Sequence, residues 1–122
     1  MDIQNNLFAD ALTRALQNSG MAFMPQGVDS PDETANLCRL FRPYALLMEV
    51  TGYPRYRLED RMKIQNEVRE INPSCKIVML CDENTDQKLA DDVRQAKKDG
   101  LIDQFIYGSI SSTYLAAVMD AL

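Results

Sequence analysis

Short apolar segments alternate with amphipathic helical segments along almost the whole chain, and this alternation restricts the fold more than any other feature. Apolar residues recur at helical spacing in residues 6–19, 31–41, 58–71 and 114–122, and in a segment containing Leu89, Val93 and Ala96. Between these segments lie short runs typical of strands, at residues 21–24, 44–50, 76–81 and 102–107. Parallel strands need crossover connections, which are usually helices. The sequence therefore predicts an α/β fold, a doubly wound parallel sheet with helices on both faces.

The ends of these segments carry residues that start or stop helices and strands. Ser30, Pro31 and Glu33 form a capping box with proline at the first helical position. Gly20 and Gly100 follow predicted helices, and Pro73 follows another. The run at 44–50 is apolar until Glu49, which is typical of a strand buried on both faces.

The strand that should open such a sheet is short or missing. Residues 1–6, before the first predicted helix, hold too few apolar residues for the buried strand that should open the sheet. We expect a minimal strand at residues 1–4 or a gap, and each backbone group buried without a partner would cost on the order of 1–3 kcal/mol. Three repairs are open: residues 21–24 pair directly with 44–50, which we favour, a second chain lends a segment, or the true start lies upstream.

Length, composition and charge narrow the function. The 122 residues suit one domain spanning 1–122, and a net charge of −5 without a basic cluster argues against nucleic-acid binding. The chain has no histidine, and Cys38, Cys75 and Cys81 show no metal-ligand spacing, so buried thiols in a reducing cytoplasm are expected. No signal peptide, membrane segment or glycine-rich phosphate loop is evident. We expect no enzyme activity, no bound cofactor and no metal.

In open parallel sheets, functional groups gather at the carboxyl ends of the strands, which here are Glu49, Cys81 and Gly108. The segments around them resemble the response-regulator receiver family of two-component signalling. Residues 46–50 (LLMEV) resemble the strand that ends in the phosphoacceptor aspartate, 77–81 (IVMLC) the strand that ends in threonine or serine, and 100–108 (GLIDQFIYG) the stretch that leads to a lysine. Residues 5–12 resemble the start of the family's first helix. The resemblance covers nearly the whole chain and rests on the order and spacing of the segments.

The resemblance also implies that the charged parts of the phosphorylation site are missing. The positions of the family's Mg²⁺-binding acidic pair hold Ile3 and Gln4, with Asp2 as a neighbour, and Mg²⁺ prefers carboxylate oxygens. Gly108 stands where the family's lysine would neutralise the phosphate. Without metal and lysine, phosphoryl transfer would lose most of its charge stabilisation.

The other positions of the phosphorylation site also differ from those of the family. Glu49 stands at the phosphoacceptor position, Cys81 replaces the switch hydroxyl, and Phe105 corresponds to the switch aromatic. A cysteine thiol is a weak hydrogen-bond donor. Glu49 is open to two interpretations: a built-in mimic of phosphoaspartate, or, as we favour, a carboxylate that is solvated or bonded by loop amides.

These features predict a degenerate receiver domain that acts through protein contacts. A homodimer or another protein, such as a histidine kinase or a fused output domain, would use the face of the fourth helix, last strand and fifth helix. Candidate contact residues on that face are Gln87, Asp91, Arg94 and Tyr114. The partner, the pathway and any output domain after Leu122 stay open.

Two alternatives remain beside this interpretation. One is a phosphorelay regulator that accepts phosphate weakly at Glu49, and the other is a flavodoxin-like domain that binds a small molecule. A basic group formed by Arg55, Arg57, Arg61 and Lys63 could bind an anion near Glu49. Acidic residues are interspersed among them, which favours a solvated start of a helix.

Overall fold

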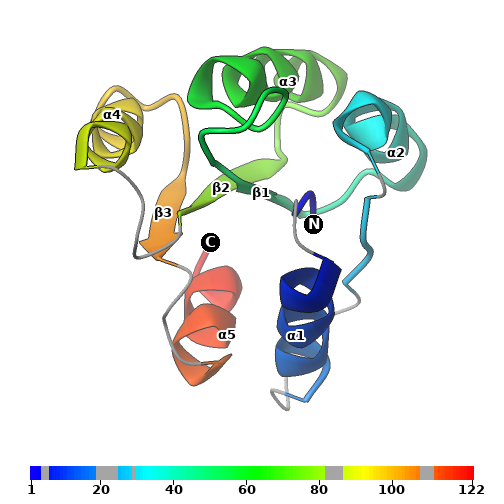
Figure 1. Ribbon diagram of the computed structural model, residues 1–122. Helices are drawn as coiled ribbons and strands as arrows, with labels where there is room; N and C mark the ends of the chain where they lie inside the picture. Colours follow the sequence, from blue (N-terminus) through cyan, green and yellow to red (C-terminus); the bar gives the residue numbers. More distant parts are fainter. Residues whose placement is uncertain (4–5, 19–24, 29, 82–86, 108–111) are drawn as a thin grey trace.

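A computed structural model of the protein describes residues 1–3, 6–18, 25–28, 30–81, 87–107 and 112–122 (Figure 1). The helices are α1 (Asn6–Gln17), a 3₁₀ turn (Pro31–Glu33), α2 (Thr34–Phe41), α3 (Leu58–Ile71), α4 (Gln87–Lys98) and α5 (Ser112–Asp120). The strands are β1 (Ala45–Glu49), β2 (Lys76–Cys81) and β3 (Gln104–Tyr107). The predicted strand at 21–24 lies outside the described residues.

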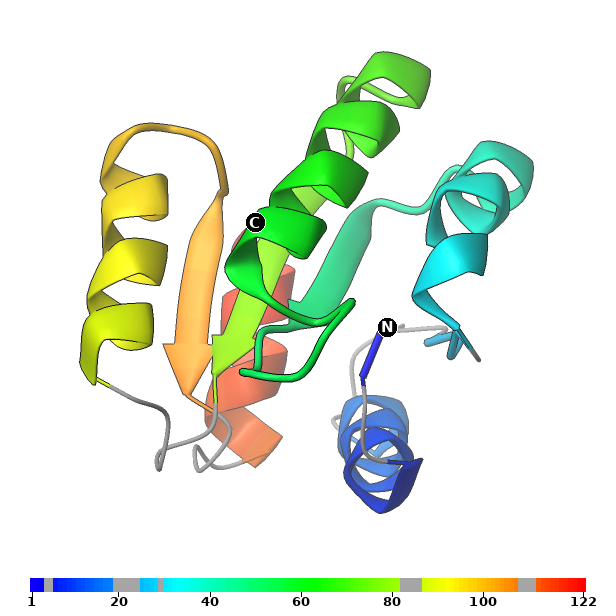
Figure 2. The same cartoon turned by 45° about the horizontal axis from the view of Figure 1, so that its top comes forward.

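The strands form one parallel sheet in the order β1-β2-β3. In Figure 2 the three arrows point the same way, so their carboxyl ends meet at one edge of the sheet. Leu46 lies opposite Ile77, and Met79 lies opposite Phe105. The predicted α/β fold with a parallel sheet is confirmed.

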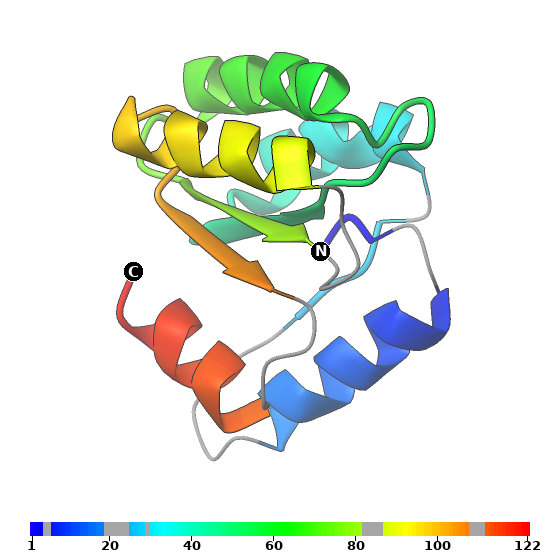
Figure 3. The same ribbon diagram turned by 60° about the vertical axis from the view of Figure 1, so that its left-hand side comes forward.

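Helices cover both faces of the sheet. α2, α3 and α4 lie on one side, and α1 and α5 lie on the other (Figures 1 and 3). Side chains of a strand alternate between the two faces, so Met48 and Met79 pack on the first side while Leu47 and Val78 pack on the second. These four side chains are at most 1% exposed, and burying each contributes about 1.5–3 kcal/mol.

Several elements begin or end away from their predicted positions. The helix predicted at 31–41 starts as a 3₁₀ turn, in which the Ser30 hydroxyl accepts from the Asp32 N–H at 3.4 Å. The last strand begins at Gln104 instead of residue 102, because pairing with β2 starts opposite Val78. The strand predicted at 44–50 spans Ala45–Glu49, and the last helix begins before residue 114 and ends at Asp120.

The missing first strand is reduced to a single bridging residue. The Asp2 N–H donates to the Leu47 carbonyl at 2.8 Å, and the Glu49 N–H donates to the Asp2 carbonyl at 3.0 Å. These two bonds place Asp2 opposite Met48 in the parallel sense. Asp2 therefore occupies this edge of β1 at Met48, as the expected minimal strand at residues 1–4 would. The favoured alternative, direct pairing of residues 21–24 with 44–50, concerns residues that lie outside the described ranges.

Residues 1–3 also form backbone hydrogen bonds on the side that faces away from β1. The Met1 amino group donates to the Gln26 carbonyl at 2.7 Å, and the Val28 N–H donates to the Met1 carbonyl at 3.0 Å. Residues 1–3 thus lie between residues 26–28 and β1, and Figure 2 shows the N-terminal segment beside that strand. A minimal strand, residues 1–3, thus lies along the outer edge of β1.

The beginning of β1 extends past this minimal strand. Even-numbered residues of β1 bond to β2, while Leu47 and Glu49 turn their backbone groups toward Asp2. The Leu47 N–H and the Ala45 carbonyl lie on the same edge of β1, nearer the start of the strand than the bonds to Asp2. No described residue forms a hydrogen bond with either group. Part of the β1 edge is therefore open in the described structure.

Hydrogen exchange can test this pattern residue by residue. We expect slow exchange for the Glu49 and Met48 amides, which are bonded on opposite edges of β1, and much faster exchange for the Leu47 amide between them. Amide-resolved exchange by NMR measures all three in one sample. Equal protection of Leu47 and Glu49, or rapid exchange at Glu49, would contradict the single-residue bridge.

Candidate functional site at the carboxyl ends of the strands

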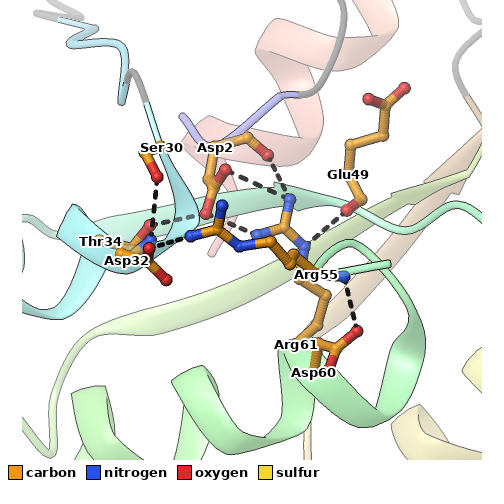
Figure 4. A network of polar contacts seen from close by, with 8 residues as sticks. All are labelled: Asp2, Ser30, Asp32, Thr34, Glu49, Arg55, Asp60 and Arg61. Carbon is orange, nitrogen blue, oxygen red and sulfur yellow. Dashed lines mark hydrogen bonds and ion pairs between the residues drawn. The ribbon is translucent and has the colours of Figure 1, made fainter. Parts of the chain in front are cut away.

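A buried arginine, Arg61 of α3, organises the carboxyl end of the sheet. Its side chain is 0% exposed. Nη1 donates to Asp2 Oδ2 at 2.5 Å, Nη2 donates to the Asp2 carbonyl at 3.0 Å and to Oδ1 at 3.3 Å, and Nε donates to the Glu49 carbonyl at 2.8 Å (Figure 4). One guanidinium therefore binds the side chain and backbone of the minimal strand and the end of β1.

The Asp2 carboxylate has a second partner. The hydroxyl of Thr34, the first residue of α2, donates to Asp2 Oδ2 at 2.6 Å, and both side chains are buried. The ring of Tyr56 lies against the guanidinium, with its centroid 4.6 Å from Cζ of Arg61. Buried charges are tolerated when they are paired and hydrogen-bonded, and both conditions are met here.

The loop between β1 and α3 packs beside this cluster. The Arg55 guanidinium forms an ion pair with Asp32, and the Arg55 N–H donates to an Asp60 carboxylate oxygen at 3.0 Å. Arg55 and Arg57 are exposed, as a solvated helix start predicts. The expectation of a solvated helix start is wrong for Arg61, because that side chain faces the core and its charge is neutralised by Asp2.

The positions assigned to the acidic pair separate in the structure. Ile3 is 5% exposed and packs with Leu12 and Leu115, from α1 and α5, on the opposite face from the Arg61 cluster. Its side chain supplies no metal ligand. Gln4 and Gly108 lie outside the described residues, so their predicted roles stay predictions.

Glu49 and Cys81 do come together at the ends of adjacent strands. Burial, and then the neighbouring Glu49 carboxylate, raise the pKa of the Cys81 thiol to about 12, while Arg94 opposes this shift. The thiol is therefore protonated at neutral pH. Glu49 is 8% exposed, and its side chain points away from the Arg61 guanidinium (Figure 4).

Two further predicted residues meet beside this pair. Phe105 is half-buried in β3, and Cζ of Arg94 lies 5.6 Å from the centre of its ring. Asp91 Oδ1 accepts from Gln87 at 2.8 Å and from Arg94 at 3.0 Å. Three of the four candidate contact residues thus form one polar row on α4, while the Tyr114 side chain lies outside what the structure describes.

The described residues offer few other groups for metal binding or catalysis. Within them, no three acidic, cysteine or histidine side chains come close enough together to hold a metal ion. Cys38, Cys75 and Cys81 are free and buried, as predicted. No helix in the described ranges is long and apolar enough to cross a membrane.

The ion pair of Asp2 with Arg61 can be tested by a double-mutant cycle. Arg61→Met leaves a buried carboxylate without its counter-ion, so we expect the free energy of unfolding to fall by about 3–5 kcal/mol. Adding Asp2→Asn removes the charge and should recover part of this loss. Urea denaturation of the four proteins measures the coupling.

The matched control is Arg69→Met, the same substitution on the same helix. Arg69 pairs with Asp103 at 3.0 Å, but the two side chains are 33% and 29% exposed. We expect that loss to be about 1 kcal/mol or less. Equal losses at the two arginines, or strictly additive effects of Asp2→Asn and Arg61→Met, would contradict the assigned role of the buried pair.

Comparisons with known proteins agree on the fold. No protein-family model matches the chain, and no curated protein sequence matches it at a significant level. Among solved structures, a DNA-binding response regulator of the LuxR family from Staphylococcus aureus matches with a TM-score of 0.75 and 11% identity, over 98% of this chain and 94% of that one. The signal receiver domain of NarL from Mycobacterium tuberculosis matches with a TM-score of 0.74 and 20% identity, over 98% and 90%.

A third match carries a different name. The structure described as adenylate cyclase from Rhodopirellula baltica has a TM-score of 0.74 and 15% identity, over 98% of this chain and 82% of that one. At such identities the likeness concerns the fold, and one fold hosts many functions. The chain has a receiver-like fold.

Proposed function

We propose that this chain is a signalling domain of the receiver type that acts through protein contacts, without Mg²⁺-dependent phosphorylation of an aspartate. One observation carries the proposal. Where the family resemblance expects an acidic pair, Ile3 is buried in the apolar core, and the neighbouring Asp2 carboxylate is bonded to Arg61 and Thr34.

The electrostatics of this end of the sheet support the proposal. A Mg²⁺ ion needs carboxylate oxygens that are free to bind it. Both oxygens of Asp2 accept hydrogen bonds from the Arg61 guanidinium, whose positive charge would repel a cation placed beside it. Metal binding at Asp2 would require breaking a buried ion pair, which is costly.

The residues at the other strand ends fit the same proposal. Cys81 stands in the place of the switch hydroxyl and is fully buried, and a thiol S–H is a weaker hydrogen-bond donor to a phosphate than a hydroxyl is. The Glu49 carboxylate lies near this buried thiol. The proposal therefore assigns no catalytic step, metal or cofactor to the chain.

Protein contacts would then carry the signal. The surface of α4 offers the linked side chains of Gln87, Asp91 and Arg94 beside the β3 strand. We propose that a homodimer or a protein partner, such as a histidine kinase or an output domain, binds this face. The net charge of −5 makes direct nucleic-acid binding an unfavourable alternative.

The test is incubation with acetyl phosphate and Mg²⁺ followed by intact mass spectrometry. We expect no added phosphoryl group, while a receiver domain with a complete acidic site, treated in parallel, gains one. Stoichiometric phosphorylation of the unchanged chain that disappears in Glu49→Gln would overturn the proposal and support a phosphorelay role.

A further inference from the structure

The loop between β1 and α3 covers part of the buried pair of Asp2 and Arg61. The ring of Tyr56, near the end of this loop, packs against the Arg61 guanidinium, with its centroid 4.6 Å from Cζ. Tyr56 is half-buried, whereas the Arg61 side chain is fully buried. An aromatic ring over a charged group excludes water, and the attraction between opposite charges is stronger where water is excluded. The loop is therefore one wall of the buried cluster.

Hydrogen bonds within the loop fix the position of Tyr56. The Thr51 N–H donates to the Tyr56 carbonyl at 2.9 Å, and the Tyr56 N–H donates to the Tyr53 carbonyl at 3.1 Å. The Thr51 hydroxyl accepts from the Tyr53 N–H at 3.1 Å. These bonds close residues 51–56 into a compact turn. The position of the Tyr56 ring therefore depends on the position of the whole loop.

One residue of this loop, Arg55, has a strained backbone. Its φ is 76°, in the left-handed region that residues with a Cβ rarely adopt and that glycine adopts readily. Two interactions hold it there. The Arg55 N–H donates to Asp60 Oδ2 at 3.0 Å, and the Arg55 side chain extends to an ion pair with Asp32, in the turn ahead of α2 (Figure 4). Such a conformation persists only when its surroundings hold it.

We propose that Arg55 is a strap that holds this loop closed over the Arg61 cluster, and that breaking its ion pair with Asp32 opens the loop without unfolding the domain. The side chains of Arg55 and Asp32 are 53% and 76% exposed, so dissolved salt screens their attraction. Once the pair is broken, the strained backbone at Arg55 favours the open loop. A surface ion pair that ionic strength weakens thereby controls solvent access to the buried charges.

The loop has little else to keep it closed. Gly52, Tyr53 and Pro54 are exposed, so the tip of the loop buries little apolar surface. Segments with few buried apolar contacts open locally at a lower free energy than the whole domain unfolds. This opening involves no phosphoryl transfer, so its test and the test of the proposed function fail independently.

The readout is hydrogen exchange of the Arg61 Nε–H, followed by NMR of the isotopically labelled protein. Asp32→Asn removes the negative charge with little change of shape, and we expect exchange about fivefold faster. Raising NaCl from about 0.05 M to about 1 M should speed exchange in the original chain and not in Asp32→Asn. The matched control is Asp91→Asn, which breaks the ion pair with Arg94 on α4, where the side chains are 59% and 42% exposed, and should leave exchange at Arg61 unchanged.

Two substitutions at Arg55 test the role of the strained backbone. Arg55→Ala and Arg55→Gly both lose the ion pair, but glycine adopts a positive φ without strain, so we expect faster exchange at Arg61 in Arg55→Ala than in Arg55→Gly. Urea denaturation of each variant separates local opening from global unfolding.

Several results would overturn the strap. These are unchanged exchange in Asp32→Asn, an equal increase in Asp91→Asn, or exchange in Arg55→Gly at least as fast as in Arg55→Ala. A rise in exchange that matches the loss of global stability would do the same, because the loop would then open only when the whole domain unfolds.

Discussion

The buried ion pair between Asp2 and Arg61 is the interaction on which the rest of this structure depends. The minimal strand makes two backbone bonds to β1 and two to residues 26–28, which is little to hold a segment at the edge of the sheet. Arg61 adds bonds to its side chain and its backbone, and Thr34 fixes the same carboxylate from α2. A single guanidinium thereby joins the N-terminal residues, β1 and α3.

The ion pair also bears on whether this end of the sheet can bind a metal. Both oxygens of the Asp2 carboxylate accept hydrogen bonds from the Arg61 guanidinium, so the charge of this carboxylate is already neutralised inside the protein. Buried pairs of this kind contribute little net stability compared with an apolar replacement, but removing one partner is strongly destabilising. The arrangement therefore supports the proposal that this end of the sheet is held in one structure and does not bind Mg²⁺.

Much of the fold could be predicted because its signals are local. The alternation of helical and strand periodicities predicted the parallel sheet, and the continuous apolar runs at Leu47 and Val78 predicted strands buried on both faces. The three cysteines behave as the small buried side chains that the sequence indicated. These features depend on neighbouring residues, so one sequence is enough to recognise them.

The Arg61 cluster could not be predicted in the same way, because its partners are 59 residues apart. A charged residue between Asp60 and Lys63 has the composition of a solvated helix start. The signal that was missed is spacing: Leu58, Arg61, Gln65 and Val68 are separated by three, four and three residues, which places the arginine on the buried face.

The measurement that tests the central claim most directly is a Mg²⁺ titration of the isotopically labelled protein, followed by NMR at the Asp2, Ile3 and Glu49 amides. If the Asp2 carboxylate is committed to Arg61, these signals should show no saturable change at sub-millimolar Mg²⁺, and only the weak drift expected of surface carboxylates at higher concentration. A saturable sub-millimolar change at Asp2 and Glu49 that is lost in Glu49→Gln would contradict the account, because it would show that this end of the sheet still binds the metal.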